Sequence, residues 1–173
     1  MAEALDPAVP DDVEHLAQAV LQAACDRELM LATAESCTGG LLASLLTDIP
    51  GKSHAFERGL VTYTNEAKAE LLGVPATILE HDGAVSEACA RAMAEGAIRN
   101  SHAHLAVSIT GYAEGGPGQP AGLVHFACAR RGGPTVHRCE GFGAVGRAQV
   151  RLKALRVALH MLREALDDLA AAA

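Results

Sequence analysis

The chain has 173 residues, of which 50% are hydrophobic and only 3% aromatic, and its 14 basic and 21 acidic residues give a formal net charge of -7. A chain of this length and composition can bury one sizeable core but hardly two, so we expect a single domain. The negative charge opposes the long-range attraction that nucleic acids and anionic lipids provide. We therefore expect neither nucleic acid nor a membrane as a partner.

The amino-terminal residues are not expected to act as a signal peptide. The segment MAEALDPAVPDD carries acids where a signal peptide needs basic residues and then an apolar run. No stretch approaches the roughly 20 apolar residues of a membrane-spanning helix. We expect a cytoplasmic protein, in which the five cysteines, an odd number without a Cys-x-x-Cys pair, stay reduced and mostly buried.

Predicted helices and strands alternate in the first part of the chain. After a flexible tail over residues 1–11, apolar residues recur at helical spacing behind Asp11-Asp12 and predict a first helix. The segment LMLATA predicts a buried strand, and GLLASLLT predicts a helix that stops at Pro50-Gly51. AFERGLVTYT predicts a second strand because it is rich in β-branched and aromatic residues.

Helical patterns dominate the middle of the chain. Asn65 is a suitable cap for the helix EAKAELLG, and Gly73 stands where helices commonly end. A short helix is expected within 74–82, and Ser86 opens a longer helix that reaches about Asn100.

The last third of the chain predicts a strand, a loop, a hairpin and a long helix. LAVSITG predicts the strand, the glycine- and proline-rich YAEGGPGQPAG predicts the loop, and LVHFACA with TVHRCEG predicts the hairpin. A helix is expected from Gly146 to Leu169, with a frayed tail over residues 168–173. Because a sheet that contains a hairpin cannot be all parallel, the pattern predicts a three-layer α/β/α sandwich with a mixed β-sheet.

The segment AESCTGG crowds polar side chains into a strand-to-helix turn. A strand that ends at Glu35 delivers Ser36 to the turn, and Gly39-Gly40 lets the next helix start close by. The N–H groups and the dipole of a helix start favour an anion, either a substrate phosphate or the oxyanion of acyl transfer. Ser36 is therefore a candidate nucleophile, although Gly-x-Ser-x-Gly is absent. The alternative is that Ser36 and Thr38 only cap the helix.

A serine nucleophile needs a base, and the chain offers eight histidines and three lysines. No histidine stands in a motif with local catalytic meaning. His102 and His104 have a spacing compatible with a metal site, but no companion carboxylate pattern supports one, and we expect no metal. Lys68 lies one helical turn into NEAKAELL, just after Tyr63, although a lone lysine there is more typical of a solvated helix surface.

Four motifs in order carry a specific resemblance. AESCTGG at 34–40, YTNEAKAELLGV at 63–74, GAVS at 83–86 and SITG at 108–111 resemble the successive signatures of the CinA carboxy-terminal domain family. The resemblance spans residues 12–167. It implies an α/β/α fold, a homodimer, and hydrolysis of nicotinamide mononucleotide to nicotinic acid mononucleotide and ammonia without metal or cofactor. Longer members of the family carry an amino-terminal domain, and we expect this domain to stand alone.

The resemblance also implies roles for particular residues. The nucleophile of the family corresponds to Ser36, and its lysine and tyrosine correspond to Lys68 and Tyr63. A desolvated Lys68 can take the Ser36 proton, and Tyr63 can relay that proton or orient the lysine. The substrate-binding residues that the resemblance implies are Thr38, Gly39, Gly40, Thr110, Gly111 and an arginine that is either Arg147 or Arg151. The two arginines share one helix face, so sequence alone does not separate them.

Two features depart from the family pattern. The loop after SITG carries Glu114, and Val145-Gly146-Arg147 stands where the family usually has Gly-Asp-Arg. An acid is an unusual neighbour for a substrate phosphate, and the usual carboxylate that could orient an arginine is missing. An alternative interpretation is therefore a catalytically weak nucleotide-binding or regulatory module on the same scaffold.

Overall fold

The structure, a computed structural model, describes residues 9–171. The main elements are α1 Asp11–Cys25, β1 Leu31–Glu35, α2 Leu41–Asp48, β2 Phe56–Val61, α3 Asn65–Leu72, α4 Ala76–His81, α5 Glu87–Arg99, β3 Leu105–Gly111, β4 Leu123–Arg130, β5 Thr135–Gly141 and α6 Arg147–Ala171. A short 3-10 helix, Ser53–Ala55, precedes β2. Most of the predicted amino-terminal tail and the last two residues of the chain lie outside the described residues.

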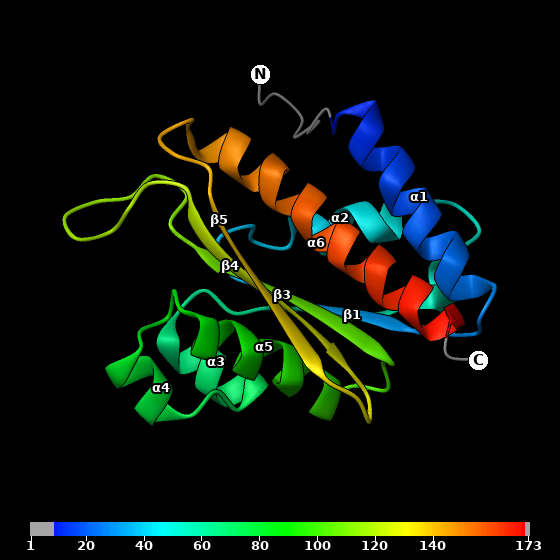
Figure 1. The fold of residues 1–173 in the computed structure, drawn as a ribbon, viewed down its shortest axis with the longest axis horizontal. Helices are drawn as coiled ribbons and strands as arrows, with labels where there is room; N and C mark the ends of the chain where they lie inside the picture. Colours follow the sequence, from blue (N-terminus) through cyan, green and yellow to red (C-terminus); the bar gives the residue numbers. More distant parts are fainter. Residues whose placement is uncertain (1–8, 172–173) are drawn as a thin grey trace, which may run out of the picture.

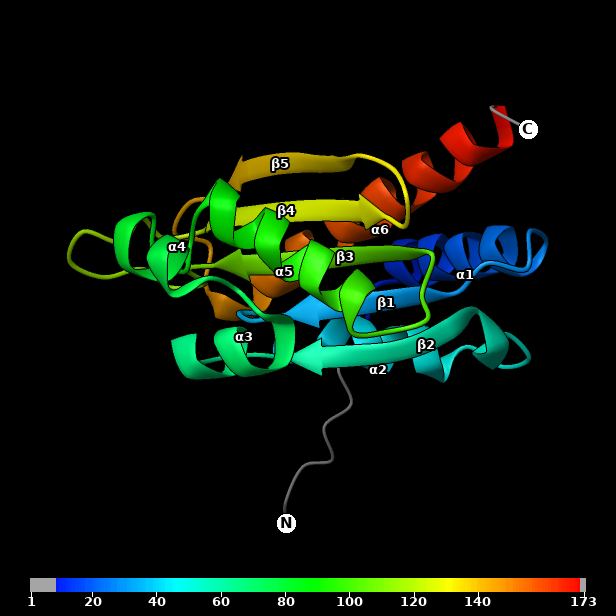
Figure 2. The same ribbon diagram turned by 90° about the horizontal axis from the view of Figure 1, so that it is seen from below.

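One five-stranded sheet arranges the strands in the order β2-β1-β3-β4-β5 (Figures 1 and 2). β1 runs parallel to β2 and β3, whereas β4 is antiparallel to β3 and β5 is antiparallel to β4. The predicted hairpin thus forms one edge of the sheet, and the mixed β-sheet is confirmed. The carboxyl ends of the three parallel strands meet at one side, where Figure 2 also shows α3 and the long loop 112–122.

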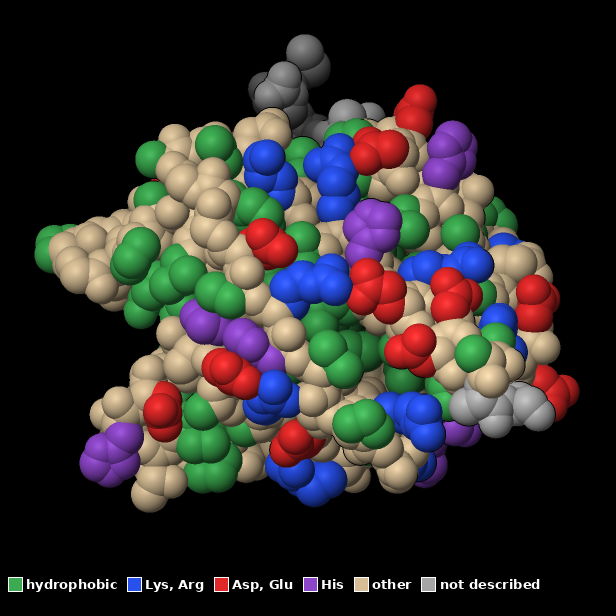
Figure 3. All heavy atoms as spheres, in the orientation of Figure 1, with side chains coloured by type: hydrophobic (Ala, Val, Ile, Leu, Met, Phe, Trp, Pro, Cys, Tyr) green, Lys and Arg blue, Asp and Glu red, His purple; other side chains and the backbone are tan. Residues whose placement is uncertain are grey.

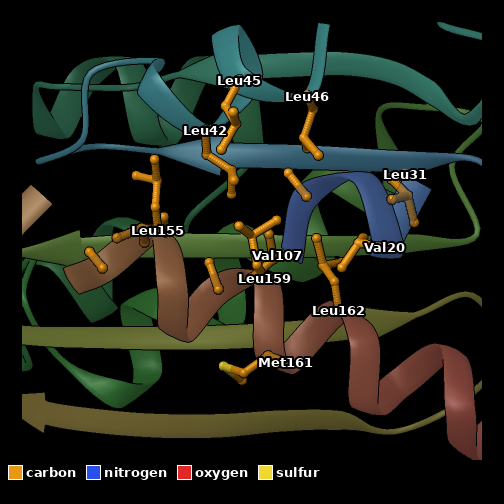
Figure 4. Packing of buried hydrophobic residues seen from close by; sticks show 14 of the residues in the cluster. Val20, Leu31, Leu42, Leu45, Leu46, Val107, Leu155, Leu159, Met161 and Leu162 are labelled. Atoms are coloured by element: carbon orange, nitrogen blue, oxygen red, sulfur yellow. The ribbon is translucent and has the colours of Figure 1, made fainter. Parts of the chain in front are cut away.

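Helices cover both faces of the sheet, with α1, α2 and α6 on one face and α3, α4 and α5 on the other (Figure 1). The predicted three-layer α/β/α sandwich is therefore confirmed. The face below α1, α2 and α6 buries large aliphatic side chains such as Leu42, Val107 and Leu159 (Figure 4). The opposite face buries mostly alanines, among them Ala90 and Ala106. Small side chains let α5 approach the sheet closely while the interior stays densely packed.

A glycine sets the distance between α5 and α3. A Cβ atom on Gly96 would lie 1.9 Å from the carbonyl oxygen of Leu72, so a larger residue does not fit unless α3 moves. The Arg99 and Asn100 side chains donate hydrogen bonds to the carbonyls of Leu72 and Leu71, at 3.3 and 3.0 Å. These contacts fix the carboxyl end of α3 against α5.

The segment between β2 and α3 differs from its prediction in two ways. β2 ends at Val61, so Tyr63 lies in a loop and not in the strand. The N-cap of α3 is Thr64, whose hydroxyl accepts the N–H of Ala67 at 3.1 Å, and the predicted cap Asn65 is the first helical residue. Threonine and asparagine are both good N-caps, so the two neighbouring positions compete closely.

The other comparisons with the predictions concern the last helix and the cysteines. α6 continues to Ala171, beyond its predicted end at Leu169. All five cysteines, which lie within the described residues, are free, and only Cys139 is exposed. In the described part of the chain, no helix combines the length and apolar character that crossing a membrane requires.

Candidate active site

A cavity of about 270 Å³ opens at the carboxyl ends of the parallel strands. Its walls come from the turn after β1, the segment from the end of β2 into α3, the residues before α5, the loop after β3 and the start of α6. Figure 3 shows the surface hollowed on this side, between the projecting loop 112–122 and the layer that contains α4. The cavity brings together six of the predicted site residues: Ser36, Tyr63, Lys68, Thr110, Gly111 and Arg147.

The turn after β1 is held by the carboxylate of Glu35. This fully buried side chain accepts three hydrogen bonds, from Thr38 Oγ1 at 2.7 Å, Leu42 N at 3.1 Å and Ala43 N at 2.8 Å. A buried carboxylate is stable only when such donors replace its hydration, and the start of a helix provides them together with a favourable dipole. The anion that we expected at this helix start is therefore supplied by the protein itself.

Ser36 occupies a fixed position directly after Glu35. Its N–H donates to the carbonyl of Ile109 at 3.0 Å, and its own carbonyl accepts the N–H of Gly39 at 3.0 Å. Among the described residues, the N–H groups of Cys37 and Thr38 have no protein acceptor. Of these two residues only Cys37 lines the cavity, so its N–H is the donor available beside the serine for an oxyanion of acyl transfer.

Lys68 of α3 meets this serine inside the protein. Its Nζ lies 3.0 Å from Ser36 Oγ, 2.8 Å from the carbonyl oxygen of Thr62 and 3.5 Å from that of Tyr63, and the residue is only 1% exposed. Burial lowers the pKa of Lys68, and the nearby thiols of Cys89 and Cys37 offset this effect only in part. A lysine in these surroundings reaches the neutral, proton-accepting form more readily than one in water.

Two residues at the end of β3 form the floor of the cavity. Thr110 Oγ1 donates to the carbonyl of Ala84 at 2.7 Å and so ties the segment before α5 to the strand. A Cβ on Gly111 would lie 2.7 Å from the carbonyl oxygen of Leu123, so the glycine allows β3 and β4 to approach closely here. Both residues line the cavity, as the resemblance implies.

Tyr63, Glu114 and Arg147 lie at the mouth of the cavity. Tyr63 is 68% exposed, and its backbone carbonyl, not its ring, accepts the hydrogen bond from Lys68. Arg147 Nη2 lies 3.0 Å from Glu114 Oε2. The Glu114 carboxylate, and to a smaller extent the Tyr63 hydroxyl, raise the pKa of Arg147. The mouth therefore combines an aromatic ring with a pair of opposite charges.

Four predicted substrate-binding residues stand outside the cavity lining. The Thr38 hydroxyl is committed to Glu35, and Gly39 and Gly40 have left-handed backbone angles, with φ of 61° and 92°, that turn the chain into α2. Arg151 Nη2 donates to the carbonyl of Thr38 at 2.8 Å. Of the two candidate arginines, Arg147 lines the cavity and Arg151 supports the turn.

None of the histidines, all of which are within the described residues, lines the cavity. His104 Nδ1 accepts the N–H of Met30 at 2.9 Å, so one member of the considered metal pair has a structural role. His125 Nδ1 and His137 Nε2 lie 3.0 Å apart below α5, where burial lowers the pKa of both rings. Within the described residues, no group of three or more His, Cys, Asp or Glu is arranged to hold a metal ion.

Sequence reasoning missed several residues of the site. Cys37 and Gln119 line the cavity, and Glu35 organises the turn without reaching the cavity. Cys37 is 8% exposed, and burial raises the pKa of its thiol to about 11, which keeps it protonated. The only sequence signal for Glu35 was its place at the end of an apolar strand. A charged residue at such a position is rarely buried unless other groups pair with it.

The fold and the site define a single α/β/α domain with a serine and a lysine in contact at the ends of parallel strands. The family model of the CinA C-terminal domain matches residues 13–166. The chain belongs to the CinA C-terminal domain family, and the resemblance seen in its motifs is confirmed.

Solved structures share this fold along nearly their whole length. The competence/damage inducible protein CihA from Agrobacterium tumefaciens is 45% identical, with a TM-score of 0.87 over 91% of this chain and 97% of that chain. A CinA superfamily protein from Klebsiella pneumoniae is 38% identical, with a TM-score of 0.85 over 90% of this chain and 98% of that chain.

Curated relatives are longer than this chain. A putative competence-damage inducible protein of Symbiobacterium thermophilum is 55% identical over 124 residues, which are 70% of this chain and 29% of the relative. A CinA-like protein of Mycobacterium marinum is 43% identical over 166 residues, which are 94% of this chain and 38% of the relative. The chain thus spans about a third of the length of these relatives.

Proposed function

We propose that the protein is an amidohydrolase that converts nicotinamide mononucleotide and water to nicotinic acid mononucleotide and ammonia. The observation that carries the proposal is the 3.0 Å contact between Lys68 Nζ and Ser36 Oγ at the wall of a cavity. A buried lysine beside a serine hydroxyl is the arrangement that Ser-Lys hydrolases use. Membership of the CinA C-terminal domain family supports the same class of reaction.

The first half of the reaction forms an acyl-enzyme. Neutral Lys68 takes the proton of the Ser36 hydroxyl while Oγ attacks the carboxamide carbon, and the carbonyl oxygen becomes an oxyanion. The N–H group of Cys37, a residue that lines the cavity beside Ser36, donates a hydrogen bond to this oxyanion. The C–N bond then breaks, and the leaving nitrogen takes the proton from Nζ and departs as ammonia.

The second half of the reaction reverses these roles. Water attacks the acyl carbon and passes its proton to Lys68 Nζ, and Ser36 Oγ leaves with that proton when the ester bond breaks. The product carries a carboxyl group, and both side chains return to their initial states. The proton transfers to and from Ser36 use the 3.0 Å contact between its Oγ and Lys68 Nζ.

Recognition of the substrate falls to the mouth of the cavity. Tyr63 and Tyr112, the only two tyrosines of the chain, both line it and offer aromatic surface to a pyridine ring. Arg147 offers the guanidinium that a phosphate prefers. The alternative, a nucleotide-binding or regulatory module, would use the same mouth without turnover.

The deciding experiment follows ammonia release from nicotinamide mononucleotide by the purified protein, with a panel of other amides beside it. Release that requires both Ser36 and Lys68 supports the proposal, and a Lys52→Ala variant, which changes a lysine far from the cavity, serves as the control. Silence toward every amide, with retained nucleotide binding, would favour the binding module. A chelator is included because activity that it abolishes would point to a metal-dependent hydrolase.

We also propose that the protein is a homodimer, as the family resemblance implies. A chain of 17.9 kDa that is half hydrophobic has apolar surface for a second copy to cover. Light scattering at micromolar concentration should give twice the mass of the chain. A clean monomer would contradict this proposal.

A further inference from the structure

The charged side chains that line the cavity influence which amides it accepts. The charged side chains in the cavity lining are Lys68, Glu114 and Arg147. Lys68 is buried, and its lowered pKa reduces its positive charge. The other two form an ion pair at 3.0 Å, with side chains that are 47% exposed at Arg147 and 60% exposed at Glu114. An incoming phosphate therefore meets an arginine that already has an anionic partner.

The loop that carries Glu114 is braced by its own backbone. Gly116 N and Gln119 N each donate to the carbonyl of the other residue at 2.9 Å. Gly115 has a φ of 76°, and a Cβ there would lie 2.6 Å from the carbonyl oxygen of Gln119. Tyr112 N donates to the carbonyl of Leu123 at 2.9 Å and closes the base of the loop. The Glu114 carboxylate is thus presented from a defined turn.

We propose that Glu114 is a specificity-determining residue that lowers the preference of the site for phosphorylated amides over unphosphorylated ones. The inference rests on the proposed function. A phosphate that binds Arg147 either displaces the Glu114 carboxylate or shares the guanidinium with it, and in both cases it lies beside that negative charge. A nucleoside has no such conflict, because its hydroxyl groups donate hydrogen bonds to a carboxylate. The site therefore accepts the nicotinamide nucleoside nearly as well as the nucleotide.

The test compares binding of a nucleotide and a nucleoside that differ only in the phosphate. Calorimetry gives the Kd of nicotinic acid mononucleotide and of nicotinic acid riboside for the unmodified chain and for Glu114→Gln. The variant should bind the nucleotide roughly three- to ten-fold more tightly, because the ion pair with Arg147 is gone, and should bind the riboside with little change.

A matched control separates this local effect from a change in overall charge. Glu164→Gln removes the same charge and also breaks an ion pair with an arginine, Arg138, at 2.9 Å, but it lies outside the cavity lining. The control should leave both affinities unchanged. The proposal is overturned if Glu114→Gln leaves the ratio of the two affinities unchanged, or if Glu164→Gln shifts that ratio equally.

Binding and turnover are measured side by side so that the two proposals fail separately. If the affinity ratio shifts but no amide is hydrolysed, the proposed role of Glu114 is supported and the proposed amidase function fails. If amides are hydrolysed but the ratio does not move, the function stands and the role of Glu114 fails. If neither ligand binds the unmodified chain and no amide is hydrolysed, both proposals fail. In an Arg147→Gln background, Glu114→Gln should have a much smaller effect, because the residue acts mainly through Arg147.

Discussion

Two connections follow neighbouring parallel strands and line the same cavity, yet they are built in opposite ways. The turn after β1, residues 36–40, is short and begins with three buried residues, and the carboxylate of Glu35 organises it with three hydrogen bonds. The loop after β3, residues 112–122, is long and largely exposed, and it contributes an ion pair in contact with solvent.

The difference separates chemistry from recognition. Ser36 and Lys68 must meet at hydrogen-bond distance, and buried contacts hold them there. A substitution that disturbs these contacts lowers stability and misplaces the reacting groups. Glu114 and Arg147 are exposed, and an exposed ion pair contributes little to stability. Substitutions around the turn should therefore alter kcat and stability, whereas substitutions at the mouth should alter affinity.

The largest effect is expected from Ser36→Ala. Loss of the nucleophile should reduce kcat by roughly a thousand-fold or more, while the melting temperature stays within about 2 °C because only a hydroxyl is removed. Ammonia release and thermal melting check the two halves. Near-normal turnover would show that water attacks directly and that the turn does not carry the chemistry.

Replacement of Lys68 by arginine tests whether this side chain is a base or a charge. Arginine stays protonated and cannot accept the Ser36 proton, so Lys68→Arg should lose kcat almost as completely as Lys68→Ala, by roughly a hundred-fold or more. Nucleotide affinity, measured separately, should change less. If Lys68→Arg keeps most of its kcat, then Lys68 binds phosphate through its positive charge and does not act as a base. The division between a catalytic turn and a substrate-binding mouth would then be wrong.

Glu35→Gln should weaken both the fold and the reaction. The amide group turns at least one acceptor into a donor that faces Thr38 Oγ1 or the N–H groups of Leu42 and Ala43. We expect a loss of about 2 kcal/mol in the free energy of unfolding and roughly a ten-fold lower kcat with little change in KM. Glu80→Gln, at an exposed position on α4, is the control and should change neither quantity.

The pH dependence of stability should report the buried lysine. Burial lowers the pKa of Lys68 in the folded protein, so between that value and about 10.4 the unfolded chain binds a proton that the folded chain does not. Stability relative to Lys68→Met should therefore rise with pH in that window. Urea unfolding of both proteins between about pH 7 and pH 10 measures the difference between their free energies of unfolding. The contributions of titratable groups that the two proteins share cancel in this difference. A constant difference would mean that Lys68 is fully charged.

The smallest effect is expected at the mouth. Arg147→Gln should raise KM for the nucleotide roughly five-fold and leave kcat and the melting temperature nearly unchanged, because the arginine is exposed and already paired. Steady-state kinetics and thermal melting check this outcome. A large fall in kcat would place Arg147 in the chemistry and would blur the division between the two connections.

Most of the fold follows from local patterns in the sequence. Apolar spacing, glycine stops such as Gly73 and the cap at Ser86 predict the elements because each depends on neighbouring residues. Thr64 and Asn65 are both suitable caps for α3, and the choice depends on how the chain leaves β2. The strand ends are accurate where an apolar run meets a glycine, as at Gly111.

The site was predictable only in part, because its contacts join residues far apart in the chain. The motifs single out Ser36 and Lys68, and both residues line the cavity. Thr38 was expected to bind substrate, yet its hydroxyl serves Glu35, a partner that sequence spacing does not reveal. Arg147 and Arg151 share a helix face, and only the path of the turn decides that Arg151 contacts it.

The close approach at Gly96 has a consequence for how loss-of-function variants will be distributed. A residue larger than glycine there must push α3 away, and α3 carries Lys68 one helical turn before the point of contact. A displacement of about an ångström is enough to disturb a reacting pair. A random mutagenesis screen for inactive but folded protein should therefore recover substitutions at Gly96, on a helix that contributes no side chain to the cavity.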